Sequence, residues 1–173
     1  MAEKTQLLSS WVRHFADANH DVSGFYSLVE EAVKRRKLPN TECKKFTMKE
    51  GGLLRSSSRE YLAVTNGEVR YDICGAPYAN GFFVSARLFA VGKFADSLIS
   101  DLSQGGAVAQ FAGMLASIVT GADTYYKLDT AQVYLHLAHE SLLDAVDQLA
   151  QKANLPPIPD LDRRPILQGF FQN

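Results

Sequence analysis

The first group of residues whose types and spacing could support chemistry consists of Tyr61, Arg70, Asp72 and Arg87. Arg70 and Asp72 are two residues apart, so on an extended strand their side chains share one face. A tight turn at Asn66-Gly67 would place Tyr61 directly opposite Asp72. Such a cluster can bind a polar ligand or a charged partner strand, or it can be a cross-strand network on the solvated side of a sheet. Whether Arg87 joins it depends on a loop that does not fix the register.

A second group lies in the segment HLAHE, where His136, His139 and Glu140 are close in sequence. A helix brings residues at i and i+3 together, and histidine is the commonest metal ligand. The order H-x-x-H-E differs from both H-E-x-x-H and H-x-x-E-H, and the spacing identifies no third ligand. We therefore expect no metal site. We expect His139 at the edge of the core with one hydrogen bond, and His136 in solvent.

The chain lacks the usual patterns of nucleophilic and phosphate-binding sites. It has no G-x-S-x-G motif, and neither Ser56-Ser57-Ser58 nor Cys74 has the sequence context of an activated nucleophile. Gly51-Gly52 lacks the lysine of a phosphate-binding loop, and no G-x-G-x-x-G occurs. These patterns predict no cofactor and favour a protein that is not an enzyme.

The longest charge-free interval runs from Leu102 to Ala122. On a helix its small residues would form one ridge, which lets another backbone come close, and an apolar stripe would lie beside that ridge. We expect this helix to be buried against protein, with a bilayer as the alternative because its length approaches that of a membrane span. The ridge, a candidate interaction surface, consists of Gly105, Ala109, Gly113, Ser117 and Gly121.

The elements expected to position these groups define an α+β fold in a single domain, residues 1–173. Apolar spacing predicts an N-terminal helical hairpin in residues 1–40, with helices over 5–18 and from Asp21 or Ser23 to about residue 38. An antiparallel β-meander of three to five strands is expected in residues 41–92, around a type I′ turn at Asn66-Gly67. C-terminal helices in residues 93–173 should pack on one sheet face. The last long one should start at Asp129, and a helix start is plausible at 162–165.

Composition limits the partners. Eighteen basic and nineteen acidic residues give a net charge of −1, which removes any whole-molecule attraction to nucleic acid or anionic membrane. The only basic run, residues 34–37, suits the solvated end of a helix. Two cysteines far apart suggest reduced thiols, and the N-terminus does not resemble a signal peptide. A cytoplasmic location is therefore expected.

Three functions remain open at this stage. The favoured one is a non-catalytic assembly or adaptor protein that forms homo-oligomers or acts as a subunit of a larger complex. The second is a membrane-associated protein that uses residues 102–122. The third is a small-ligand or metal-binding sensor or enzyme that uses the Asp72 face or the histidine segment. A protein partner or self-association is expected rather than nucleic acid, with a membrane as the lesser possibility.

Overall fold

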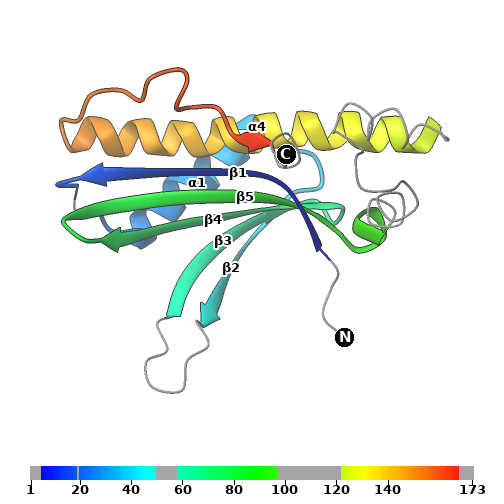
Figure 1. Cartoon of the computed structure of the whole chain (residues 1–173), viewed down its shortest axis with the longest axis horizontal. Coiled ribbons are helices and arrows are strands. Elements are labelled where there is room, and N and C mark those ends of the chain that lie inside the picture. Colours follow the sequence, from blue (N-terminus) through cyan, green and yellow to red (C-terminus); the bar gives the residue numbers. More distant parts are fainter. Residues whose placement is uncertain (1–4, 19, 50–57, 97–121, 168–173) are drawn as a thin grey trace, which may run out of the picture.

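The computed structural model describes residues 5–18, 20–49, 58–96 and 122–167. An antiparallel sheet has the strand order β2-β3-β4-β5-β1-β6, so the first strand lies between the fifth and the sixth (Figure 1). Helix α1 lies behind the strands in this view and α4 runs along their upper edge. The predictions of an α+β fold and an antiparallel sheet are confirmed. The elements are β1 (Thr5–Ala16), α1 (Val22–Arg36), β2 (Glu42–Lys49), β3 (Ser58–Thr65), β4 (Val69–Tyr78), β5 (Gly81–Val91), α4 (Ala122–Lys152) and β6 (Ile166–Leu167).

The predicted N-terminal helical hairpin is wrong, because residues 5–16 form strand β1 and only α1 is a helix. Leu8, Trp11, Val12 and Phe15 fit a helical stripe, yet the burial alternates: Trp11 and Phe15 are buried while Val12 is 68% exposed. Strand β1 pairs with β5 along nearly its whole length. This long-range pairing satisfies the backbone hydrogen-bonding groups of β1. The residues of β1 alone do not predict it, because the partner strand is distant in sequence.

Helix α1 begins and ends as its sequence predicts. The Asp21 carboxylate accepts hydrogen bonds from the backbone N–H groups of Ser23 and Gly24, which satisfies two donors at the helix start. At the other end Lys37 adopts the left-handed conformation and closes the helix. The buried face of α1, which includes Phe25, Tyr26 and Val29, packs against the sheet and α4.

The β3–β4 hairpin has a register two residues away from the predicted one. Val64 pairs with Tyr71 and Ala63 pairs with Asp72, so Tyr61 does not lie opposite Asp72. The predicted type I′ turn is also wrong, because Gly67 has a positive φ of 93° but Asn66 does not. The Asn66 side-chain oxygen accepts hydrogen bonds from the N–H groups of Glu68 and Val69, which stabilises a wider loop. A shift by two residues leaves each side chain on its predicted face.

Strands β3 and β4 separate at the position of Tyr26. Their ladder has only four pairs, from Leu62–Ile73 to Thr65–Arg70, whereas β2 and β3 stay paired from Glu42–Thr65 to Lys49–Ser58. The Tyr26 hydroxyl donates to the Glu60 carbonyl at 2.6 Å and accepts from the Gly75 N–H at 3.2 Å. A side chain of α1 therefore takes the place of the next rung of the ladder. Beyond it β2 and β3 diverge from β4 (Figure 1).

The C-terminal half departs from the prediction in two places. Helix α4 begins at Ala122, so Asp129 does not start it, and residues 160–164 form turns that lead into β6 rather than a helix. The structure describes one long helix in the predicted C-terminal helical region. Residues 97–121, with Gly105, Ala109, Gly113, Ser117 and Gly121, lie outside the described residues. Among the helices that are described, none is long and apolar enough to cross a membrane.

The segment between α4 and β6 is fastened across α4 and β1. The Trp11 indole donates to the Asp162 carbonyl at 2.7 Å, and Arg13 contacts the Asp162 carboxylate at 2.6 Å. Arg163 forms two hydrogen bonds to Asp147 on α4, at 2.9 and 2.8 Å. Ile158, within this segment, is buried with 6% of its surface exposed.

Candidate functional site

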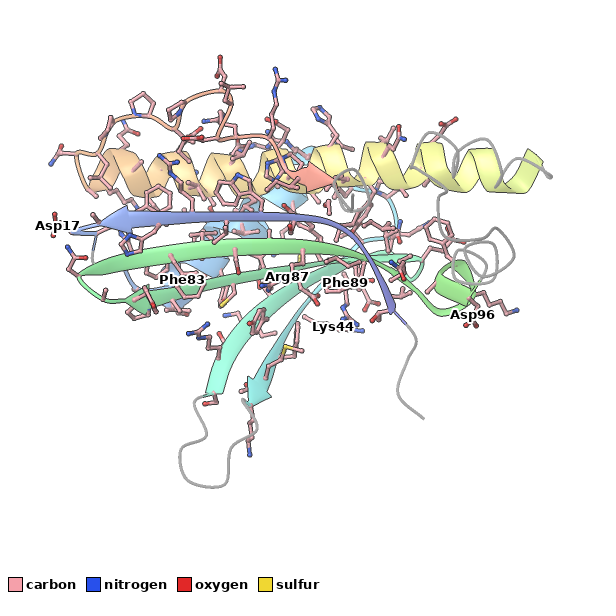
Figure 2. The ribbon with its side chains drawn as sticks, in the orientation of Figure 1. Asp17, Lys44, Phe83, Arg87, Phe89 and Asp96 are labelled. Carbon is pink, nitrogen blue, oxygen red and sulfur yellow. The ribbon has the colours of Figure 1, made fainter. Side chains whose placement is uncertain are left out.

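The face of the sheet turned away from α1 and α4 is not covered by either helix, and we call it the uncovered face. Side chains alternate along each strand, so the residues that share a face with Asp72 follow from the register. Figure 2 shows Phe83, Arg87 and Phe89 along β5 and Lys44 on β2. The uncovered face includes Ser10, Val12, His14, Glu42, Lys44, Phe46, Met48, Arg59, Tyr61, Ala63, Thr65, Arg70, Asp72, Cys74, Ala76, Tyr78, Phe83, Ser85, Arg87, Phe89 and Ile166.

The predicted cluster comes together in part. The Arg70 guanidinium holds both carboxylate oxygens of Asp72 at 2.9 to 3.2 Å. Arg87 lies directly across from Asp72 in the β4–β5 register, which the sequence left open. Tyr61 faces the same side but is displaced along β3, because its neighbour Ala63 takes the place opposite Asp72.

The charges of this cluster do not balance. Asp72 is 6% exposed, and burial raises the pKa of its carboxyl group, while the hydrogen bonds and charge of Arg70 and the charge of Arg87 lower it. Arg70 forms an ion pair with Asp72, whereas no ion pair joins Asp72 to the exposed Arg87. Among the described residues no carboxylate lies within ion-pair distance of the Arg87 guanidinium. This guanidinium has its donors available to an added group.

Aromatic rings surround the cations. The Arg70 guanidinium carbon lies 5.6 Å from the Phe89 ring centroid and 6.0 Å from that of Phe46. Arg59 lies 5.1 Å from the Phe83 ring, within range for a cation–π interaction. Sequence patterns did not assign these rings or Arg59 to the site. Alternation along the strand after residue 81 marked Phe83 and Phe89, but only the register shows which cations they meet.

Exposed apolar side chains gather on the same face. Seven large apolar or aromatic side chains are exposed among the described residues, and four of them belong to the uncovered face. Their exposed fractions range from 54% for Met48 to 68% for Val12. Clusters of exposed apolar surface commonly mark sites of protein interaction. The four residues are Val12, Met48, Tyr78 and Ile166.

Cys74 and Tyr61 are the candidate nucleophiles of the uncovered face, and neither is activated by its surroundings. Cys74 is fully buried, and burial raises the pKa of its thiol, so it is neither accessible nor ionised. Burial also raises the pKa of the Tyr61 hydroxyl. What the face offers is guanidinium groups for an anionic group and rings for apolar side chains.

The histidine segment is divided between solvent and core. His136 is exposed, whereas His139 is 4% exposed. The Nε2 atom of His139 lies 2.5 Å from the Arg163 carbonyl, which can only accept, so Nε2 carries the proton and Nδ1 accepts from the Tyr71 hydroxyl at 2.7 Å. In the part of the chain that the structure describes, no group of three or more His, Cys, Asp or Glu could hold a metal ion. His139 fastens the C-terminal segment to the core.

A cavity of about 390 Å³ lies between the end of α1 and β2. It is broadly open, and burial raises the pKa of the Cys43 thiol in its wall, so this sulfur is a weak nucleophile. Nothing in its geometry favours a particular ligand. The cavity is lined by Glu30, Val33, Lys34, Lys37, Leu38, Thr41 and Cys43.

No protein-family model, curated protein sequence or solved structure matches this chain.

Proposed function

We propose that this chain is a non-catalytic adaptor, a subunit of a larger complex that docks another protein on its uncovered face. The observation that carries the proposal is that four of the seven large apolar side chains exposed among the described residues lie on this one face. Exposed apolar surface on a folded protein is stabilised when a partner covers it. The two cysteines form no disulfide, which agrees with a function in a reducing compartment such as the cytoplasm.

Two further features support binding of a macromolecule. The apolar groups are spread over β1, β2, β4 and β6, so they suit an extended contact better than a single small molecule. The groups between them are rings and guanidiniums, which are enriched at protein interfaces and often dominate their affinity. A small ligand would call for a concave site with converging polar groups.

The test is photo-crosslinking in the cells from which the protein comes. A photoreactive amino acid replaces Val12 or Tyr78 on the uncovered face, or Val133 on α4 as a matched control. Val12 is 68% exposed and Val133 is 58% exposed, so reactivity toward solvent is nearly equal at the two valines. We expect Val12 and Tyr78 to yield adducts to the same peptides of one other protein, identified by mass spectrometry, and Val133 to yield none of them.

Adducts to that protein from Val133 alone would contradict the proposal. Adducts that join two copies of this chain through Val12 and Tyr78 would replace it with a homo-oligomer. If neither face position forms a protein adduct under conditions in which both photoreactive variants are folded, the adaptor function is rejected.

A further inference from the structure

The uncovered face carries more positive than negative charge. Within its described residues four cationic side chains stand against the carboxylates of Glu42 and Asp72, which leaves a net charge of +2 on a chain whose overall charge is −1. Both carboxylates are already engaged, Glu42 by Lys44 and Asp72 by Arg70. The surplus positive charge is therefore carried by the other two cations, Arg59 and Arg87.

We infer that the partner segment docked on this face is acidic, with carboxylates that bind Arg87 and Arg59 and apolar side chains between them that cover Phe83, Phe89 and the exposed apolar groups. This inference rests on the proposed function and adds the chemistry of the partner. A carboxylate accepts two parallel hydrogen bonds from a guanidinium, a geometry that lysine cannot supply.

The spacing of the two arginines suits a protein segment. Arg59 lies opposite Met48 at the diverging end of the sheet, whereas Arg87 lies opposite Asp72, with Phe83 and Ser85 preceding it on β5. Arg59 lies over the Phe83 ring, and Phe83 precedes Arg87 by four residues on β5, a rise on the order of 13 Å along an extended strand. Carboxylates at that separation, joined by apolar residues, match the alternation of charge and ring on the face.

Three other occupants fit less well. A second copy that presented the same face would bring two positive surfaces together. Residues 102–122 of the chain itself contain no charged side chain and cannot supply a carboxylate. A nucleic acid would gain from rings and cations, but the overall charge of −1 provides no attraction for a polyanion.

The test uses the full chain and short fluorescent peptides in which glutamate alternates with leucine and phenylalanine. Two matched peptides carry lysine or serine in place of glutamate. We expect fluorescence anisotropy to show binding of the glutamate peptide that weakens with salt, because added ions screen exposed charges. Binding of the lysine and serine peptides should be at least about tenfold weaker, which corresponds to about 1.4 kcal/mol.

Three variants locate the contact. Arg87→Gln should weaken binding of the glutamate peptide about tenfold, and Arg87→Lys should restore only part of it, because the bidentate pair is lost. Arg164→Gln is the matched control: it removes the same charge from an exposed arginine in the turn before β6 and should change the affinity less than about twofold. Amide shifts in NMR spectra should change on β3, β4 and β5.

Equal binding of the serine peptide, or equal affinity of Arg87→Gln and wild type, would overturn the inference. So would displacement of the glutamate peptide by a thymidine oligonucleotide that binds more tightly, or amide shifts on this face that depend on protein concentration alone. The proposed function fails separately. If crosslinking identifies a partner through Val12 and Tyr78 whose contacting peptide lacks carboxylates, the adaptor function stands and the acidic partner is rejected.

Discussion

At the scale of single residues, the Tyr26 hydroxyl has an unusual position between two strands. It satisfies the Glu60 carbonyl and the Gly75 N–H, two backbone groups that would otherwise pair with each other across the sheet. Tyr26 is fully buried, and desolvation raises the pKa of its hydroxyl well above the ordinary value, so it stays neutral and able to donate. At this position the hydroxyl of an α1 side chain replaces a backbone–backbone hydrogen bond between β3 and β4.

We predict that Tyr26→Phe lowers the free energy of unfolding by about 1–3 kcal/mol, because it leaves a buried donor and acceptor unsatisfied. Urea denaturation measures the change. Tyr78→Phe is the control, since Tyr78 is 60% exposed and the same atom is removed there into solvent. We expect that variant to lie within about 0.5 kcal/mol of wild type. An equal loss in both variants would show that Tyr26 does not bridge the strands.

His139 should make stability depend on pH. Burial lowers the pKa of His139 from its ordinary value of 6.5, although the hydrogen bond to the Arg163 carbonyl and the charge of Glu140 raise it. The charges of Arg163 and His136 lower it further, and the Tyr71 hydroxyl faces Nδ1. Because the unfolded state binds the proton more readily, the contribution of His139 is complete above pH 6.5 and is lost as the pH falls from there toward the folded-state pKa.

The prediction is tested with His139→Gln, which does not titrate. At about pH 8 the variant should be less stable than wild type by about 1–3 kcal/mol, because buried hydrogen bonds are lost or lengthened. The difference in the free energy of unfolding should narrow as the pH is lowered to about 5, since only wild type must protonate a buried imidazole. Urea titrations at each pH measure the free energy of unfolding of both proteins. A difference between them that is constant across the pH range would contradict the prediction.

At the scale of elements, the contact of α1 with β4 depends on a missing side chain. A Cβ atom at Gly75 would lie 2.5 Å from Cδ1 and 2.7 Å from Cε1 of the Phe25 ring. Glycine therefore lets the ring rest directly on the strand. This close approach also brings the neighbouring Tyr26 hydroxyl to the backbone of β4.

We predict that Gly75→Ala destabilises the protein by about 1–3 kcal/mol, because the core must move to accept the methyl group. In a Phe25→Leu background, which removes the ring, the same substitution should cost less. Thermal and urea unfolding of wild type, the two single variants and the double variant gives the coupling free energy between positions 25 and 75. Additive effects would show that the Phe25 ring is not what excludes a side chain at Gly75.

The elements that local signals define were predicted from the sequence, and those that distant pairing defines were not. The Asp21 cap and the buried face of α1 follow from residues within that helix, as does the inward face of β5. Strand β1 was not predicted, because its apolar spacing fits a helix as well as a strand and its partner β5 begins only at residue 81. The turn at residue 66 was misread because its side chain, rather than its backbone, sets the loop.

The candidate site was predictable to the same extent. Alternation alone placed Arg70, Asp72 and Tyr61 on one face. The position of Arg87 opposite Asp72 required the β4–β5 register, and the identity of the rings next to the cations required the pairing of strands β2 to β5. A register error of two residues leaves each side chain on the correct face of the sheet, but it assigns the wrong cross-strand neighbours.

At the scale of the whole molecule, the exposed cations of the uncovered face should be dispensable for folding. Arg87 is exposed and has no ion pair among the described residues, so we predict that Arg87→Gln changes the free energy of unfolding by less than about 0.5 kcal/mol. Urea denaturation checks this, and size-exclusion chromatography with light scattering checks that assembly is unchanged. A large loss of stability would mean that Arg87 supports the fold instead of awaiting a partner.

The strand order has a consequence for how the chain acquires its shape on the ribosome. Strand β1 is made first, yet its main neighbour β5 ends only at Val91 and its other neighbour β6 is the last described strand. Pairing over such long sequence separations slows folding, because the intervening loop must close before any contact repays it. During synthesis β1 therefore stays unpaired and prone to aggregate until β5 has also emerged, an interval in which chaperones would protect it.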